Sequence, residues 1–485
     1  MVRGAAKKFD AIFIGTGSGL ELVNALIRKD PGAKLAVIDK DDPGGICLNR
    51  GCIPSKILLY SAEVVRAAER ARIFGVDLEI KKIDFPFIMD RMRRMVSADV
   101  EAIRASLHAV PNVRYFPAAA EFTAPYTLAV AGTTISAPQI FLCTGSRPGI
   151  PPVPGLEEAG YLTSDTILRL TRLPESLAII GGGYIAAEYG HFFASMGSAV
   201  TIIGRNPRFL PGTEPEISGA AALELGKRLT LLTDCEVTRV EEGGPAGKTV
   251  IATSRGDRKE VEITAEQVLV AAGRVPNSDI LHPERGGIAT DPHGWIVVDE
   301  YMQTSQPGVW AFGDADGRHL FKHVANRETL VVFLNAIEGE KTAMDYRVVP
   351  RAIFTSPEIA SVGIGEAEAV SQYGADSILI GFADYENTAK GSAMETKNAF
   401  AKLVIGKKTG EILGAHFIGP DAAVLIQELV TVMNSGDPTI NPVTTAMHIH
   451  PALSEVVQAA ARTLMPVGHY HQLLEEKDYG AKGSR

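Results

Sequence analysis

Short apolar runs that end in glycine recur along the chain, and each is followed by a segment of helical periodicity. Ala11-Ile-Phe-Ile leads into Gly15, and Leu177-Ala-Ile-Ile leads into Gly181 in the same way. Buried strands that alternate with helices are typical of α/β proteins with parallel sheets. The pattern therefore predicts an α/β fold with two nucleotide-binding units of the Rossmann type.

Changes in this pattern predict where the units begin and end. Prolines between residues 148 and 154 place the end of the first unit near residue 150, and the second unit runs to about Asn277. The segment from Gly308 to Asp314 indicates another strand and loop that return to the first unit. From about Tyr346, strand-rich segments followed by helices predict a third, α+β unit. The expected domains are 1–150 with 278–345, then 151–277, then 346–485.

The first glycine motif has the sequence context of a dinucleotide site. Gly15, Gly17 and Gly19 follow a predicted strand and precede a predicted helix, where backbone N–H groups and the helix N-terminus can meet a pyrophosphate. Asp39 ends the next apolar run, near the spacing at which a carboxylate accepts hydrogen bonds from an adenosine ribose. The alternative is an ordinary glycine-rich turn, because such short patterns recur by chance.

A second motif repeats this arrangement, with Gly181, Gly183 and Ala186 in the three small positions. The strand after it ends in Gly204-Arg205-Asn-Pro-Arg208, where an NAD site normally carries an acid. The planar fork of arginine suits a 2′-phosphate, so Arg205 and Arg208 favour NADPH over NADH. The alternative is that both are solvated loop arginines.

Charge and hydropathy exclude several other classes of protein. The chain of 485 residues carries 48 basic and 57 acidic residues, a net charge of −9, and no long basic run that would bind nucleic acid. The N-terminal segment lacks the pattern of a signal peptide, and no apolar stretch is long enough to span a membrane. We expect a cytoplasmic protein without a nucleic-acid or membrane partner.

Two of the four cysteines, Cys47 and Cys52, lie together in Gly44-Gly-Ile-Cys-Leu-Asn-Arg-Gly-Cys-Ile-Pro-Ser-Lys56, just before a predicted helix. At a helix start this spacing can bring two sulfurs to disulfide distance, and the helix dipole favours a thiolate. A zinc half-site is the alternative, but no second pair of suitable spacing accompanies it, and no metal site is expected. Cys143 and Cys235 stand alone and are expected to be packing residues.

These residues resemble the FAD-dependent pyridine-nucleotide disulfide oxidoreductases over nearly the whole chain. The motifs that carry the resemblance are the cysteine block, the two glycine motifs, Thr144-Gly-Ser-Arg-Pro148, Gly273-Arg-Val-Pro-Asn277, Gly313-Asp314 with Leu320 to Ala325, and His450-Pro-Ala-Leu-Ser-Glu455. The resemblance implies that the first unit binds FAD, that the second binds NAD(P)H, and that the third is a dimerisation domain.

The resemblance also implies roles for individual residues. Cys52 is the sulfur beside the flavin, Cys47 exchanges with substrate, Lys56 and Glu188 form an ion pair near the flavin, and Tyr184 shields the ring. His323 lies near the isoalloxazine ring. Further cofactor-binding positions are Thr144, Gly145, Gly273, Asp314 and Ala325.

The acid–base group is expected in the third unit. An imidazole with a carboxylate partner can take and return a thiol proton, which thiol exchange requires. The resemblance assigns these roles to His450 and Glu455, with His448 as the neighbouring alternative. It also implies that the other subunit supplies this histidine, and hence a homodimer with a shared active site.

Three alternatives remain for the function. The cysteine and histidine blocks resemble dihydrolipoyl dehydrogenase, which is the first expectation. Arg205 departs from that enzyme's NAD-type acid, and other stretches, such as Leu320-Phe-Lys-His-Val-Ala-Asn326, are similar to mycothione reductase, so an NADPH-dependent reductase of a small disulfide is the second. The third is a flavoprotein docking subunit of a dehydrogenase complex, with a lipoyl domain as its partner.

Overall fold

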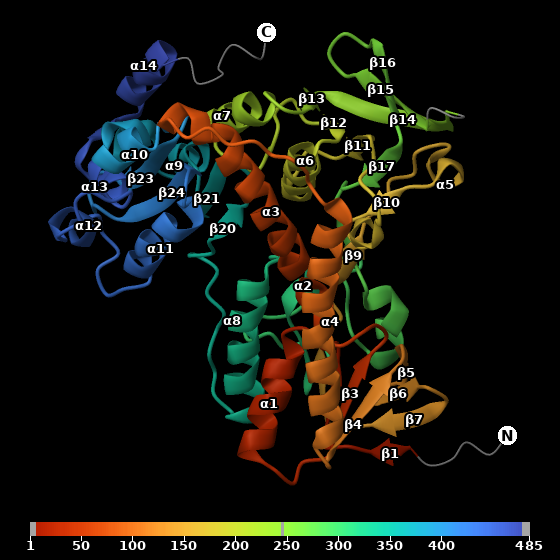
Figure 1. Cartoon of the computed structure of the whole chain (residues 1–485). Helices are drawn as coiled ribbons and strands as arrows, with labels where there is room; N and C mark the ends of the chain where they lie inside the picture. The colour runs from red at the N-terminus through yellow and green to blue at the C-terminus, as the bar shows by residue number, and fades with distance from the viewer. Residues whose placement is uncertain (1–5, 244–246, 478–485) are drawn as a thin grey trace.

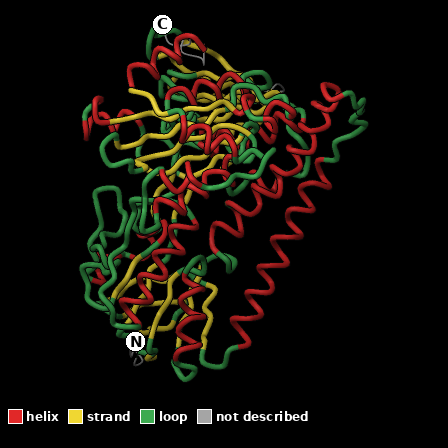
Figure 2. Tube along the Cα trace, turned by 90° about the vertical axis from the view of Figure 1, so that its left-hand side faces the viewer, coloured by secondary structure: helices red, strands yellow, loops and turns green. Residues whose placement is uncertain are grey.

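The computed structural model describes residues 6–243 and 247–477, and its sheets divide the chain into three units. Figure 1 shows the first unit at the bottom, the second at the upper right and the third at the upper left. Turned by 90°, the same molecule shows strands gathered in a lower and an upper layer, with long helices running between the two along one side (Figure 2). The described helices include none that is both long and apolar enough to cross a membrane.

The first unit is built on a five-stranded parallel sheet in the order β19-β8-β2-β3-β4. All four side chains of β2 are buried, as expected for a strand covered on both faces. A small four-stranded sheet, β1-β7-β6-β5, extends this unit. The strands are β1 (Lys7–Lys8), β2 (Ala11–Ile14), β3 (Leu35–Asp39), β4 (Val113–Pro117), β5 (Ala120–Ala124), β6 (Thr127–Val130), β7 (Thr133–Ser136), β8 (Gln139–Leu142) and β19 (Val309–Ala311).

The strand β19 comes from far along the chain and completes the edge of this sheet beside β8. The chain therefore returns to this sheet after the strands of the second sheet are complete. The helices of this part are α1 (Gly19–Lys29), α2 (Gly45–Arg50), α3 (Cys52–Arg70), α4 (Phe85–Ala109) and α8 (Lys322–Val332). The long α4 begins at a capped end, where the Asp84 side chain accepts a hydrogen bond from the Phe87 N–H at 3.2 Å.

The second unit repeats this architecture with the parallel sheet β10-β17-β11-β12-β13. An antiparallel three-stranded sheet, β14-β15-β16, packs beside it, and a short pair, β18-β9, joins it to the first unit. The elements are β9 (Ser146–Pro148), α5 (Leu156–Ala159), β10 (Leu162–Thr163), β11 (Ser176–Ile180), α6 (Tyr184–Met196), β12 (Ala199–Ile203), α7 (Pro215–Leu225), β13 (Thr230–Leu232), β14 (Cys235–Glu242), β15 (Lys248–Ser254), β16 (Glu260–Ala265), β17 (Gln267–Val270) and β18 (Arg274–Pro276).

The third unit is an antiparallel six-stranded sheet, β20-β21-β24-β23-β22-β25, with helices packed against it. Its elements are β20 (Arg351–Ile353), β21 (Glu358–Gly363), α9 (Glu366–Tyr373), β22 (Ile378–Asp384), α10 (Ala389–Ala393), β23 (Phe400–Gly406), β24 (Ile412–Gly419), α11 (Ala422–Met433), α12 (Asn441–Thr445), α13 (Glu455–Arg462), β25 (Leu464–Pro466) and α14 (Val467–Lys477).

A buried group of charges joins the second and third units. Lys402 on β23 contacts three carboxylates, with Nζ to oxygen distances of 2.6 Å to Glu214, 2.5 Å to Glu216 and 2.7 Å to Glu366. Burial acts to lower the pKa of Lys402, but attraction to the carboxylates outweighs it and the pKa is raised. The three carboxylates lie close enough together to hold a metal ion, and the Lys402 ammonium supplies the positive charge between them instead.

Candidate active site

Each parallel sheet turns into its first helix at the point where the strand order reverses. There, Gly15 follows β2 beside the end of β8, and a Cβ on it would lie 2.0 Å from the Cys143 carbonyl oxygen. Gly181 follows β11 beside the end of β17, and a Cβ there would lie 2.2 Å from the Ala271 oxygen. Both have positive φ, so both turns need glycine. Open α/β sheets bind their ligands at such switch points.

A cavity of about 880 Å³ opens at the first switch point and extends to the cysteine pair. Its lining includes the predicted residues Gly15, Gly17, Asp39, Cys47, Cys52, Lys56, Thr144, Gly145, Tyr184, Glu188, Asp314, His323 and Ala325. These positions come from opposite ends of the sequence, so the fold brings most of the predicted site together. Gly19, Gly181, Gly183, Ala186, Gly273, His450 and Glu455 do not line this cavity.

Asp39 closes the end of the cavity next to the first glycine turn. Its carboxylate accepts a hydrogen bond from the Thr16 N–H at 2.9 Å and another from the Asp41 N–H at 3.0 Å. Burial raises the pKa of Asp39, against the opposing effect of these hydrogen bonds. A carboxylate at the end of the second strand of a Rossmann unit is placed to accept hydrogen bonds from an adenosine ribose.

Asp314 also lines the cavity, three residues beyond the end of β19. Its carboxylate accepts a hydrogen bond from the Ser146 hydroxyl at 2.5 Å, and the Arg274 Nε lies 3.9 Å from it. Arg274 also donates to the Ser146 hydroxyl at 2.7 Å. Ser146 and Arg274 both lie inside motifs quoted above, yet sequence reasoning gave them no role. In the sequence, the two residues are marked only by their positions next to Gly145 and Gly273. The pairing of β9 with β18 brings them together beside Asp314.

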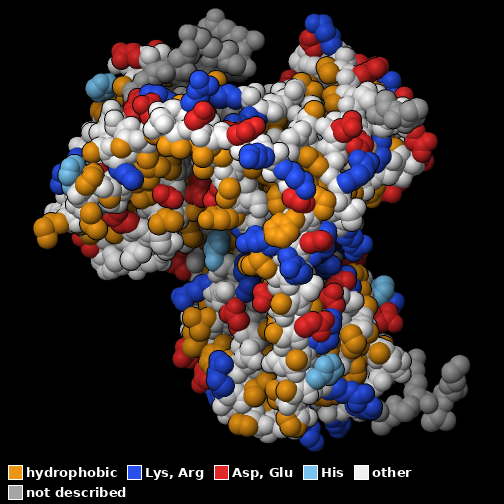
Figure 3. All heavy atoms as spheres, viewed as in Figure 1, with side chains coloured by type: hydrophobic (Ala, Val, Ile, Leu, Met, Phe, Trp, Pro, Cys, Tyr) orange, Lys and Arg blue, Asp and Glu red, His pale blue; other side chains and the backbone are white. Residues whose placement is uncertain are grey.

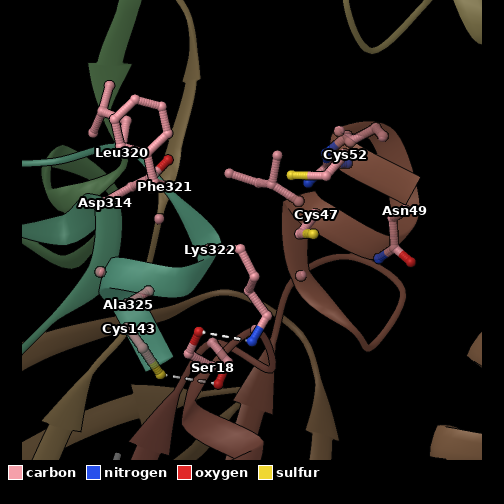
Figure 4. Close-up of a pocket in the computed structure, with 18 of the residues that line it drawn as sticks. Ser18, Cys47, Asn49, Cys52, Cys143, Asp314, Leu320, Phe321, Lys322 and Ala325 are labelled. Carbon is pink, nitrogen blue, oxygen red and sulfur yellow. Dashed lines mark hydrogen bonds between the residues drawn. The ribbon is translucent and has the colours of Figure 1, made fainter. Parts of the chain in front are cut away.

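The two thiols stand on consecutive helices. Cys47 lies in α2 and Cys52 begins α3, so this helix starts earlier than the sequence predicts, with Gly51 as the break between the two helices. Figure 4 shows the Cys52 sulfur pointing into the pocket, with Cys47 below it. Both are free thiols here, and their side chains are hydrogen-bonded to each other.

This contact separates the acidities of the two thiols. The hydrogen bond from Cys47, with help from the charge of Lys56, lowers the pKa of Cys52 to about 7. The same contact, together with burial, raises the pKa of Cys47. Cys52 is therefore the thiol that ionises first, and Cys47 needs an external base to become a nucleophile.

Lys56 and Glu188 form the predicted ion pair. The Lys56 Nζ lies 2.9 Å and 2.7 Å from the two carboxylate oxygens of Glu188, whose side chain is only 7% exposed. Phe354, from the third unit, donates its backbone N–H to Glu188 at 3.0 Å, and the Lys56 ammonium lies 4.7 Å from the centre of its ring. No local motif marks Phe354, so sequence reasoning missed it.

His323 and Lys322 begin α8 at the cavity wall. The Nε2 atom of His323 is 2.8 Å from the Pro350 carbonyl oxygen. The Lys322 ammonium donates to the Ser18 hydroxyl at 3.1 Å and contacts Glu21 at 3.0 Å, which ties α8 to the first glycine turn (Figure 4). Sequence reasoning gave neither Lys322 nor Ser18 a role. A large cavity with a glycine turn and two partly buried acids in its lining suits a dinucleotide such as FAD.

The other two cysteines lie apart from the pair. Cys143 follows β8 directly, is partly buried and lines the cavity, and its sulfur donates to the Gly15 carbonyl at 3.1 Å. Cys235 is buried at the start of β14. Burial raises the pKa of both thiols. They remain protonated at neutral pH, in keeping with the packing role expected for them.

Arg205 and Arg208 lie on an exposed loop after β12, at the switch-point edge of the second sheet. No acid follows the end of β12 in residues 204–213, and Gly182 of the glycine motif lies against Gly204 there. Gly181, Gly183 and Ala186 form the turn and first residues of α6 beside it. The loop therefore lies where the second nucleotide site would hold an adenosine ribose.

His450 and Glu455 form a pair in the third unit, away from the cysteines of the same chain. His450 Nδ1 lies 2.8 Å from Glu455 Oε1, and the His450 side chain is 71% exposed. His448 instead contacts Glu428 at 3.0 Å and is only 6% exposed. Its accessibility makes His450 the better candidate of the two for proton transfer with a substrate.

The geometry combines a dithiol, a partly buried ion pair and two glycine turns at sheet switch points, and residues 9–329 match the family model described as pyridine nucleotide-disulphide oxidoreductase. Residues 349–461 match the dimerisation domain of the same family. The chain belongs to the class I pyridine-nucleotide disulfide oxidoreductases. Members of this family depend on FAD and use NAD(P)H.

Among individual proteins, the chain is 35% identical to mycothione reductase of Mycobacterium tuberculosis over 465 residues, which cover 93% of this chain and 98% of the relative. It is 34% identical to dihydrolipoyl dehydrogenase of Synechocystis over 472 residues, covering 93% and 98%. A solved structure of the HOCl-induced flavoprotein disulfide reductase RclA from Escherichia coli, as a Cu(II) complex, superposes with a TM-score of 0.83 at 28% identity, covering 94% and 99%. These relatives bear out the family and leave the substrate open.

Proposed function

We propose that this protein uses NADPH to reduce a low-molecular-weight disulfide, through FAD and the Cys47–Cys52 pair. The choice of coenzyme rests on the residues after β12. Gly204 and Arg205 stand there in place of the acid of an NAD site. A dihydrolipoyl dehydrogenase normally transfers electrons to NAD⁺, so this loop favours the reductive direction.

The chain's own residues support a defined sequence of thiol steps. Bound FAD supplies the two-electron relay between the nicotinamide and the cysteine disulfide. Once that disulfide is reduced, Cys52 holds its proton less tightly than Cys47. Cys47, made a thiolate by an external base, attacks the substrate disulfide and releases one thiol. Cys52 then attacks Cys47, which releases the second thiol and restores the disulfide.

The base in this proposal is His450 of the partner subunit. Met447 and Ile449, next to it in the chain, are 100% and 77% exposed, and Val424 on α11 is 71% exposed. Figure 3 shows further hydrophobic side chains gathered on the surface of this unit. A second copy packed over these side chains would bury them and would carry its His450 toward Cys47.

Replacing His450 with glutamine is expected to lower kcat about 100-fold, because proton transfer then depends on solvent. The pH profile of kcat should also lose the ionisation step that the imidazole contributes. The His469→Gln variant, changed at an exposed position on α14, serves as the control. Full-speed turnover by the His450→Gln variant would show that another group moves the proton.

The coenzyme assignment predicts a selective effect of Arg205→Glu. A carboxylate there would repel a 2′-phosphate and accept hydrogen bonds from a free ribose hydroxyl, so KM for NADPH should rise at least about tenfold while KM for NADH falls or stays the same. Initial rates with both coenzymes measure this. Equal changes in the two KM values would discard the assignment.

Dihydrolipoyl dehydrogenase is the second candidate, favoured by the His450 to Glu455 block and by the 34% identity noted above. Initial rates of the FAD-loaded enzyme distinguish the two candidate functions. We expect NADPH to be oxidised with mycothione, the disulfide of mycothiol, and expect negligible reduction of NAD⁺ by dihydrolipoamide. Fast reduction of NAD⁺ with no activity on mycothione would replace the proposal by this second candidate.

A further inference from the structure

A third arginine stands at the edge of the second nucleotide site, on an element distant from the glycine motif. Arg255 begins the turn between β15 and β16, and its Nη1 donates to the Arg205 carbonyl oxygen at 3.3 Å. Nothing in the local sequence marks this residue, because its neighbours form an ordinary hairpin turn. The fold alone places it against the loop of Arg205 and Arg208.

A ladder of backbone hydrogen bonds fixes this turn to the loop. The Arg255 N–H donates to the Asp234 carbonyl at 2.7 Å, and the Asp234 N–H donates to the Asn206 carbonyl at 2.8 Å. One residue further on, the Cys235 N–H donates to the Gly204 carbonyl at 3.0 Å. The three segments therefore form one edge, and the position of Arg255 relative to Arg205 is set by the backbone.

The charges at this edge favour an anion. Among the described residues, Arg205, Arg208 and Arg255 have no carboxylate partner within salt-bridge distance. Of the two acids nearby, Asp257 is paired with Lys259 at 2.8 Å, and Asp234 contributes one carboxylate beside Gly256. Three exposed arginines therefore stand on or against the loop after β12.

We propose that Arg255 is a specificity-determining residue that binds the 2′-phosphate of NADPH together with Arg205 and Arg208. This inference rests on the proposed use of NADPH and adds a residue from a separate element. One N–H of its guanidinium holds the Arg205 carbonyl, and the remaining N–H groups are free for phosphate oxygens. Because the turn is fixed by the backbone, binding costs little additional ordering.

The test compares Arg255→Ala with Arg258→Ala. Arg258 lies in the same turn, its removal changes the net charge equally, and none of its described contacts reaches the loop after β12. Calorimetry with 2′,5′-ADP and 5′-ADP measures binding without turnover. We expect Arg255→Ala to weaken 2′,5′-ADP binding about tenfold, to leave 5′-ADP unchanged and to raise KM for NADPH alone, with partial recovery in Arg255→Lys.

The outcomes separate this inference from the proposed coenzyme. If the unaltered protein prefers 2′,5′-ADP to 5′-ADP but Arg255→Ala behaves as Arg258→Ala does, the inference is wrong and the use of NADPH stands. If the unaltered protein binds the two nucleotides equally, both are overturned.

Discussion

Replacing Cys47 with serine should reduce turnover of a disulfide substrate by at least about 1,000-fold. A serine hydroxyl is not ionised near neutral pH and cannot form a disulfide with the substrate or with Cys52. Neither the Lys56–Glu188 pair nor the loop after β12 includes Cys47, so NADPH should still bleach the absorbance of the bound flavin in an anaerobic stopped-flow experiment. The expected result is a fast first half-reaction followed by no second one.

Cys235→Ser is the matched control, because it changes a buried thiol of the second unit in the same way. It should retain nearly normal turnover. A Cys47→Ser variant that still reduced its disulfide at the normal rate would show that the cysteine pair is not the electron exit.

Replacing Lys402 with methionine should destabilise the protein by about 3–5 kcal/mol, since it leaves buried carboxylates without their cation. Glu214, Glu216 and Glu366 lie around the ammonium group, and the Lys402 side chain is 1% exposed. The midpoint of urea unfolding measures the loss. Lys408→Met, at an exposed position just beyond β23, is the control and should change the midpoint little.

The loss should also depend on pH. Burial acts to raise the pKa of Glu214, but Lys402 outweighs it and the pKa is lowered, so this carboxylate stabilises the protein above its unfolded pKa and loses that contribution as pH falls. In Lys402→Met burial is no longer outweighed, so the pKa of Glu214 should instead be raised in the folded state. The difference from the unaltered protein should therefore be largest near neutral pH and shrink in acid. A difference independent of pH would mean that packing, rather than charge, holds this cluster.

Local motifs predicted much of the fold and of the site. The glycine turns at Gly15 and Gly181 are recognisable because only glycine fits beside the adjoining strand ends. The family fold, the cofactors and the Lys56–Glu188 contact are confirmed. The predicted roles of the site residues and the domain boundaries at 150, 277 and 345 stay predictions.

Other parts could not be predicted because they depend on contacts between distant segments. Phe354 reaches Glu188 from the third unit, and Arg255 reaches the loop after β12 through a hairpin turn. Lys402 is another example, because a single lysine in an apolar strand gives no sign of the acids that surround it. Such residues carry no short-range pattern, and their partners are fixed only when distant segments pack together, within one unit for Arg255 and between units for Phe354 and Lys402.

The most direct test of the account is a reductive titration of the FAD-loaded protein with NADPH under anaerobic conditions, followed by alkylation and mass spectrometry of the cysteines. The account predicts that Cys47 and Cys52 resist alkylation in the oxidised protein and become modified together after NADPH is added, while Cys143 and Cys235 stay protected. Equal modification of Cys47 and Cys52 before and after NADPH would contradict it, because no disulfide would then lie on the path of the electrons.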